Sequence, residues 1–294
     1  MSNPTDPRRE LANAYFVQDR SNEDELTRLQ IQSQMLTASM GGVLPEQPDP
    51  ARFQRVLDVG CGTGDWLLEV AKTYPGISLL IGVDANKKMV DYARGQAEAQ
   101  GVSDRVEFHV MDALRMLEFP DTFFDLVNQR FGFSFIRTWE WPKLLDEYQR
   151  VVKFGGVVRI TEPSLMEEVE EENNSALLRL SRIQLQAFYQ AGYFFTEDGN
   201  GVINELARLL YQYGRLQNVQ TLSYNVEYRP ETVQGQRFCE DMKRLFKTAL
   251  PFYRRWMRVP DDYETLYQQL LNEMQQPDFV ANVHLLTAWG TRSA

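Results

Sequence analysis

Residues 56–66, VLDVGCGTGDW, join a short apolar run to a glycine-rich loop, and the segment LLIGVD follows at residues 79–84. The continuous apolar run before the loop predicts a strand buried on both faces of a parallel sheet. Residues 66–72, between the loop and the second run, carry apolar side chains at helical spacing. The result is a strand–loop–helix–strand unit that ends on Asp84. Such a unit predicts a nucleoside-binding site, because glycines admit a ligand close to the backbone and the acid accepts hydrogen bonds from a ribose diol.

The glycine spacing indicates which kind of nucleoside is bound. The loop differs from the dinucleotide fingerprint G-x-G-x-x-G, because Asp65 stands where the third glycine would be. An acid there suits the helix dipole, but it repels a pyrophosphate that would bind at the same place. Asp65 and Asp58, which lies just before the loop, together favour a ligand carrying an ammonium or sulfonium group. A NAD-dependent oxidoreductase is therefore the less favoured alternative.

The acid and the loop together resemble the acid-x-G-x-G-x-G motif of class I S-adenosylmethionine-dependent methyltransferases. The turn KFGG at residues 153–156 resembles the L-K-P-G-G turn of that family, with Phe154 in place of the proline. FDLV at residues 124–127, followed by Phe131-Gly132, is similar to the quinone- and sterol-methylating branches. The resemblance covers about residues 50–162. It implies S-adenosyl-L-methionine as cofactor and S-adenosyl-L-homocysteine as product, but it does not specify the acceptor.

The family's fold is an α/β, Rossmann-like, doubly wound and mostly parallel sheet of seven strands in the order 3-2-1-4-5-7-6. The resemblance implies this fold here, with an antiparallel seventh strand. Further apolar runs fit the remaining five strands, at residues 106–110, 123–127, 157–161, 219–228 and 282–289.

The domain organisation follows from the segments of the chain that this seven-stranded fold does not account for. Residues 1–50 are expected to form an N-terminal helical segment that closes over the cofactor. Residues 51–294 are then the methyltransferase domain, with helical inserts at about 164–200 and 230–280 that form a cap. Two helices are predicted between the fifth and sixth strands, and one of them must be the ordinary crossover helix. The second insert is expected to carry two helices.

The resemblance also implies which residues contact the cofactor. Asp84 would bind the ribose, the glycine loop the methionyl part, and Asp112 the adenine amino group. The full set of predicted contacts lies in the loop or at the carboxyl ends of strands: Asp58, Gly60, Cys61, Gly62, Gly64, Asp84, Ala85, Met89, Met111, Asp112, Ala113, Asn128, Gln129 and Arg130.

The acceptor side is less determined by the sequence. Methyl transfer from a sulfonium needs a general base only if the acceptor loses a proton. Glu162, at the end of the fifth strand, and His284, in the seventh, are the candidate catalytic groups, although Glu162 fits a structural role equally well. His109 is expected in the core. The aromatic segment at residues 131–141 either fills the core or walls a pocket for a small, uncharged or cationic, largely apolar acceptor.

Composition narrows the class of protein further. The chain has 294 residues and a net charge of −10, which argues against nucleic acid as a partner. Two cysteines make no disulfide framework, and no spacing resembles a metal site. With no apolar run of membrane-spanning length and a polar first ten residues, a cytoplasmic protein is expected. Two questions stay open. One is the oligomeric state, and the other is whether the chain is a fold member that binds the cofactor without methyl transfer, as a regulator or a cofactor-assisted cyclase.

Overall fold

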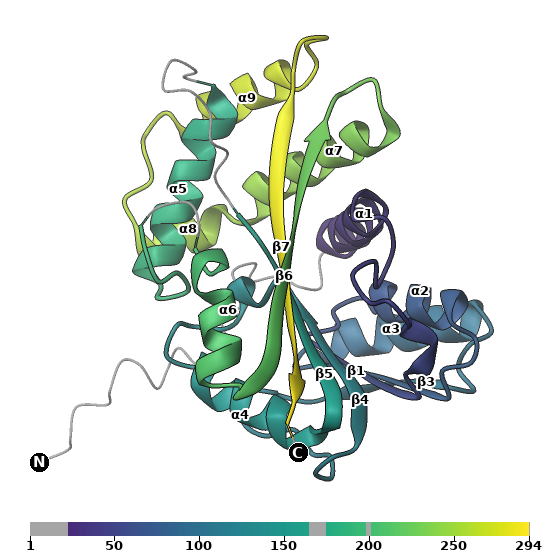
Figure 1. The fold of residues 1–294 in the computed structure, drawn as a ribbon. Coiled ribbons are helices and arrows are strands. Elements are labelled where there is room, and N and C mark those ends of the chain that lie inside the picture. The colour runs from purple at the N-terminus through teal and green to yellow at the C-terminus, as the bar shows by residue number, and fades with distance from the viewer. Residues whose placement is uncertain (1–22, 165–174, 198–200, 294) are drawn as a thin grey trace, which may run out of the picture.

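The computed structural model describes residues 23–164, 175–197 and 201–293. Its centre is a seven-stranded sheet in the order β3-β2-β1-β4-β5-β7-β6, which confirms the predicted topology (Figure 1). β7 runs antiparallel to both β5 and β6, whereas the other neighbours are parallel. The strands are β1 (Arg55–Val59), β2 (Leu79–Asp84), β3 (Val106–Val110), β4 (Phe124–Arg130), β5 (Val152–Pro163), β6 (Leu216–Tyr228) and β7 (Ala281–Arg292).

Helices cover both faces of this sheet, which explains the continuous apolar run in β1. Val56 packs into one cluster with α2 (Asp65–Thr73) and α3 (Lys87–Ala99). Leu57, the next residue, packs into the other cluster with α4 (Trp141–Val151). Both side chains are fully buried. Successive strand residues point to opposite faces, so every residue of β1 must be apolar unless it has a special role.

The second half of the chain builds the cap. α6 (Ile203–Gln212) packs on β5, β6 and β7 and is the crossover helix, whereas α5 (Ala176–Gln190) packs on α8 (Leu250–Trp256) and α9 (Tyr263–Glu273). The insert between β6 and β7 holds three helices rather than the predicted two. α8 begins at Leu250, shortly after α7 (Val233–Thr248) ends, and Pro251 lies in its first turn, because proline is tolerated there but not in the interior of a helix.

The two long strands β6 and β7 carry this cap beyond the rest of the sheet (Figure 1). α1 (Glu23–Ser39) lies beside α7 and also contacts α2. The N-terminal segment is therefore part of the same body as the sheet and the cap. Its predicted closing role over a cofactor stays a prediction, and its first 22 residues lie outside the described part of the chain.

A buried ion-pair cluster joins α1 to α7. Arg28 donates to Glu25 at 2.7 Å and to Asp241 at 3.1 Å, and Gln32 Nε2 donates to Asp241 at 3.3 Å. Arg28 and Asp241 are each 1% exposed. Burial raises the pKa of Asp241 to about 6, against the opposing effect of Arg28. Because removing one partner would leave a buried charge uncompensated, this cluster fixes α1 against the cap.

Two expectations need correction. The sequence predicts His109 in the core, but β3 is an edge strand and the His109 side chain is 42% exposed, with Nε2 3.0 Å from Glu107. It also predicts that β4 ends at residue 127, but the strand continues through Arg130. The three polar residues 128–130 extend the strand because each still pairs with β5. They therefore belong to the sheet rather than to a loop.

Candidate functional site

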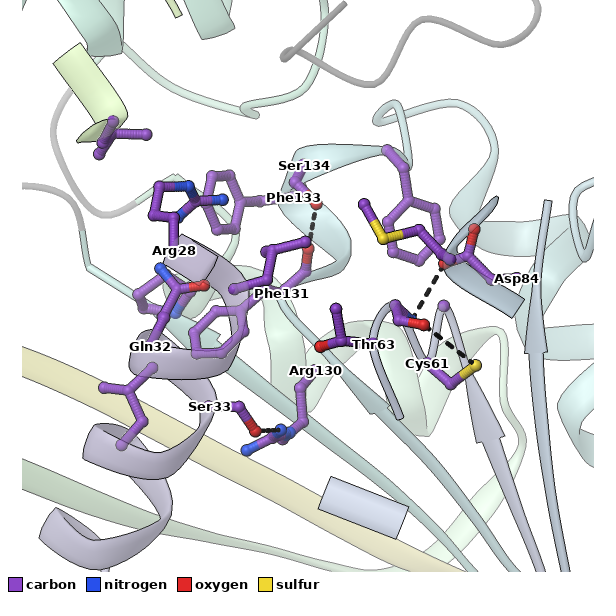
Figure 2. A pocket seen from close by; sticks show the side chains of 18 of the residues that line it. Arg28, Gln32, Ser33, Cys61, Thr63, Asp84, Arg130, Phe131, Phe133 and Ser134 are labelled. Carbon is purple, nitrogen blue, oxygen red and sulfur yellow. Dashed lines mark hydrogen bonds between the residues drawn. The ribbon is translucent and has the colours of Figure 1, made fainter. Parts of the chain in front are cut away.

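One large cavity of about 1130 Å³ opens at the carboxyl ends of β1, β2 and β4. Its floor is the glycine loop and the ends of the parallel strands, and its other walls come from α1, α5, α7, α8, β7 and the turn after β4. Figure 2 shows side chains from α1, the glycine loop and that turn facing one another across this space. The cavity therefore joins two regions, one at the strand ends and one beneath the cap.

The glycine loop is held against β2 by its backbone. The amides of Gly60 and Cys61 donate to the Val83 carbonyl at 2.8 and 3.0 Å. Gly60 and Gly62 have φ values of +69° and +53°, which glycine adopts without strain. A Cβ on Gly60 would lie 2.7 Å from the Phe135 ring, whereas one on Gly62 would meet no protein atom within 4 Å. Packing thus requires glycine at position 60, and open cavity space adjoins position 62.

Asp84 closes the other side of this loop. Its Oδ2 accepts from the Gly62 amide at 3.1 Å, and its Oδ1 accepts from the Asn86 amide at 2.8 Å. The residue is 8% exposed and lines the cavity. These two amides hold the carboxylate at the edge of the cavity, beside the glycine loop. This arrangement, with the open space next to Gly62, fits a ribose diol and the chain attached to it.

Asp58 is the second carboxylate of the floor, and a buried network positions it. Asn128 donates to Asp58 at 2.7 Å and accepts from Arg159 at 2.8 Å, and Arg159 is paired with Glu46 at 2.8 Å. Asp58 is 4% exposed, and burial raises its pKa to about 6, although the nearby Arg130 opposes this shift. Asp58 is thus an acid that changes charge near neutral pH at the base of the cavity.

Arg130 places a cation beside these acids and ties β4 to α1. Its Nη2 donates to Ser33 Oγ at 2.9 Å, as Figure 2 shows, and its Nη1 donates to Thr37 Oγ1 at 3.3 Å. Burial lowers the pKa of Arg130 to about 10, which leaves it charged at neutral pH; Asp58 and Asp65 oppose the shift. A cation and two carboxylates on one wall complement the carboxylate and ammonium of an amino acid.

The structure brings most of the predicted cofactor contacts to this cavity. Eleven line it: Asp58, Gly60, Cys61, Gly62, Asp84, Ala85, Met89, Met111, Asp112, Ala113 and Arg130. Gly64, Asn128 and Gln129 do not. Gly64 begins α2 at a φ of +79°, and a Cβ there would lie 2.6 Å from Phe108, so packing accounts for this glycine. Asn128 and Gln129 are fully buried beneath the floor, where they bond to the two acids Asp58 and Glu162.

Neither predicted catalytic group lines the cavity. Glu162 is fully buried and accepts from the amides of Gly132 at 2.7 Å and Phe133 at 3.2 Å, and from Gln129 at 3.0 Å. Burial raises the pKa of Glu162 to about 8, against these three donors. His284 lies on β7 between two residues that do line the cavity, and its own side chain does not.

Glu162 instead fixes the turn after β4. Phe131 adopts a φ of +57°, a strained value for a residue other than glycine, and its carbonyl accepts from Ser134 Oγ at 2.7 Å. The rings of Phe131, Phe133 and Phe135 all line the cavity. The Glu162 carboxylate therefore positions three aromatic side chains without touching the cavity itself.

Replacing Glu162 by glutamine tests this positioning role. The folded protein binds more protons than the unfolded chain between pH 4.5 and 8, since the pKa of Glu162 is raised, so its free energy of unfolding falls as pH rises. We expect wild type to lose about 1–2 kcal/mol more than E162Q between pH 6.5 and 8 in denaturant titrations. Affinity for S-adenosylhomocysteine should stay within about threefold. If E162Q instead loses turnover at every pH while its free energy of unfolding depends on pH as in wild type, Glu162 acts as a base.

Several cavity residues escaped the sequence analysis because they come from the two inserts and the N-terminal helix. They are Arg28, Gln32 and Ser33 from α1, Ser181 and Gln184 from α5, and Asp241 from α7. The sequence signal for them is a polar residue on the apolar face of an amphipathic helix. That signal marks a residue as unusual, but it does not tell which partner the face will meet.

The topology and the site together define the class. A seven-stranded sheet of this order, with an acid–glycine loop and the carboxylate at the end of β2 facing one cavity, is the architecture of a class I S-adenosylmethionine-dependent methyltransferase domain, and the chain contains such a domain. Residues 56–156 match a family described as "Methyltransferase domain". This match, with the antiparallel β7, disfavours the dehydrogenase alternative.

Curated relatives match about two fifths of the chain. The demethylmenaquinone methyltransferase of Thermus thermophilus is 39% identical over 109 residues, which cover 37% of this chain and 47% of that protein. The ajmaline N-methyltransferase of Rauvolfia serpentina is 36% identical over 116 residues, covering 40% of this chain and 38% of the relative. The chain thus spans less than half the length of these two relatives.

Solved structures share the fold over more of the chain. Phosphoethanolamine N-methyltransferase 2 of Haemonchus contortus, in complex with S-adenosyl-L-methionine, superimposes with a TM-score of 0.59 at 18% identity and covers 95% of this chain and 59% of that one. The YcgJ protein of Bacillus subtilis gives a TM-score of 0.53 at 20% identity, over 87% and 99% of the two chains. Within the described part of this chain, no helix has the length and apolarity to span a membrane.

Proposed function

We propose that this protein transfers a methyl group from S-adenosylmethionine to a small, largely apolar organic acceptor. The observation that carries the proposal is the continuity of one cavity from the nucleoside-type floor to an apolar chamber beneath the cap. The chamber walls include the buried side chains Phe133, Leu177, Leu178, Phe238 and Leu245. The names of the relatives specify demethylmenaquinone and ajmaline as methyl acceptors, which are organic molecules of this general kind.

In this proposal, each part of the cofactor is bound by a different residue of the cavity floor. Asp84 accepts hydrogen bonds from the ribose hydroxyls, and Asp112, which lines the cavity after β3, accepts from the adenine amino group. Asp58 faces the ammonium of the methionyl part, and Arg130 faces its carboxylate. The open space beside Gly62 leaves room for the chain that connects them.

The chain's own contribution to methyl transfer is placement and exclusion of water. Bound S-adenosylmethionine supplies a methyl group already activated on a sulfonium. The turn at residues 131–135 holds aromatic rings against the cavity, where their faces attract a cation by about 0.5–2 kcal/mol. α1 covers the same space and is held there by the Arg28–Asp241 and Arg130–Ser33 contacts. These groups orient two reactants in a dry chamber.

The charge on Asp58 should make cofactor binding depend on pH. With a pKa of about 6, Asp58 is mostly neutral at pH 5 and mostly ionised at pH 7, so its attraction for an ammonium grows over this range. We expect affinity for S-adenosylhomocysteine to rise by about tenfold from pH 5 to pH 7, measured by calorimetry. The Asp58→Asn variant should bind S-adenosylhomocysteine at every pH with the weak affinity that wild type shows at pH 5. A steep profile that survives in D58N would assign the pH dependence to another group.

The proposal as a whole is tested with purified protein. Stabilisation against heat by S-adenosylhomocysteine, but not by NAD, is expected if the floor binds as proposed. Methyl transfer is then followed with labelled S-adenosylmethionine over a panel of quinols, phenols and amines. Cofactor binding with no transfer to any member of a broad panel would favour the regulator or cyclase alternative. Stabilisation by NAD alone would contradict the proposal.

A further inference from the structure

A buried side-chain amide lies on the cap wall of the cavity. Gln184, on α5, lines the cavity and is 4% exposed. Within the described ranges its side chain makes no hydrogen bond to protein. Its amide atoms are not closed off from the cavity, so a molecule bound there can supply the hydrogen bonds that the protein does not.

The surroundings of Gln184 place it within the acceptor chamber. Ser181 lies three residues before it and Leu177 seven before, so the three share one face of α5, and all line the cavity. Ser181 likewise has no hydrogen-bond partner among the described residues. The wall is therefore apolar with two neutral hydrogen-bonding groups, of which Gln184 offers both a donor and an acceptor.

The charged side chains that α1 and α7 present to the cavity are already bonded to one another. Arg28 is bonded to Glu25 and to Asp241, and Asp241 also accepts from Gln32, so the charged groups of this cluster are paired with one another. The arginines of α5 do not line the cavity, so an ion entering beside Gln184 would lose its hydration without finding an opposite charge on this helix. A neutral polar group loses far less in the same transfer, because one or two hydrogen bonds replace its water.

Resting on the proposed function, we infer that Gln184 and Ser181 recognise the methyl acceptor, and that the acceptor is an uncharged molecule with an apolar body and a neutral hydrogen-bonding group such as a hydroxyl, carbonyl or amide. Gln184 pairs with that group, while the leucine and phenylalanine side chains around it enclose the body. This narrows the acceptor from the uncharged or cationic molecule that the sequence alone allows.

The experiment measures binding of five naphthalene probes to the protein saturated with S-adenosylhomocysteine. The probes are 2-naphthol, naphthalene-2-carboxamide, 2-methylnaphthalene, naphthalene-2-carboxylate and 2-naphthylmethylammonium. We expect the first two to bind about tenfold more tightly than the other three. In Gln184→Met, which keeps the volume of the side chain but removes its amide, this preference should disappear while 2-methylnaphthalene binds as before. Gln186→Met, on the exposed face of the same helix, should keep the preference.

A second measurement keeps the inference falsifiable. The ligand-free Gln184→Met protein should melt at or above the temperature of wild type, because the substitution breaks no hydrogen bond to the described residues and places an apolar side chain on an apolar wall. A preference for neutral polar probes that survives in this variant, tighter binding of either ion, or a clear fall in melting temperature would each overturn the inference. Titration of S-adenosylhomocysteine alone tests the proposed function separately, since Gln184 lies on the cap rather than on the cavity floor.

Discussion

Replacing Gly62 by valine is expected to abolish binding of S-adenosylhomocysteine, with Kd raised by about a hundredfold or more. The backbone at Gly62 has a φ of +53°, and a Cβ there meets no protein atom within 4 Å. The valine side chain would therefore enter the space that the proposal assigns to the methionyl chain, and not a neighbouring part of the fold. The loss in affinity should appear in calorimetry at pH 7.

The backbone cost of this substitution can be measured separately. A β-branched residue at positive φ costs about 1–3 kcal/mol in stability wherever it lies. Gly101, at the end of α3, has a φ of +67°, and a Cβ added there would also meet no protein atom within 4 Å. Gly101→Val should thus lose stability as Gly62→Val does, yet bind S-adenosylhomocysteine as wild type. Normal binding by Gly62→Val would show that the glycine loop is not the cofactor site.

Replacing Asp84 by alanine should weaken binding of S-adenosylhomocysteine by about a hundredfold or more. Two hydrogen bonds from ribose hydroxyls to a carboxylate contribute roughly 1.5–3 kcal/mol each, and alanine removes both. The substitution also removes the acceptor of the Gly62 and Asn86 amides, which loosens the loop itself. Affinity is measured by calorimetry, and stability by denaturant titration.

Asp125 provides the matched control for Asp84. Its Oδ2 also accepts from two backbone amides, those of Gln54 at 3.0 Å and Arg55 at 2.7 Å, but it lies at the start of β4, away from the cavity. Asp125→Ala should therefore lose stability and retain cofactor affinity within about threefold. Equal losses of affinity in both variants would mean that Asp84 acts only through the fold.

The sequence by itself determined the local units of the cofactor floor. The β1–loop–α2–β2 unit follows from an apolar run, three glycines and an acid, all within thirty residues. α3 begins where Asn86 caps it, accepting from the Lys88 amide at 2.9 Å, and ends before Gly101, which has a positive φ. These features depend on neighbours along the chain, so the residues carry the information directly.

Residues at the ends of strands were harder to assign. Glu162 and Asp84 both end parallel strands, yet Asp84 faces the cavity and Glu162 faces the amides of the turn at residues 131–134. His109 is half-exposed because β3 lies at the sheet edge, where one strand neighbour is missing. Which way such a side chain points depends on how neighbouring strands end and which loops fold over them.

Only the tertiary structure decided the side of the cavity that we propose for the acceptor. Arg28 and Asp241 are 213 residues apart, and no local pattern predicts that α1 and α7 would bury them together. Gln184 resembles any other glutamine of an amphipathic helix until the cap closes over the strand ends and leaves its amide facing the cavity. The proposed cofactor floor is local because glycines, a capped helix and two acids follow one another in the chain. The chamber proposed for the acceptor is assembled from segments distant in sequence, so its chemistry exists only once they pack.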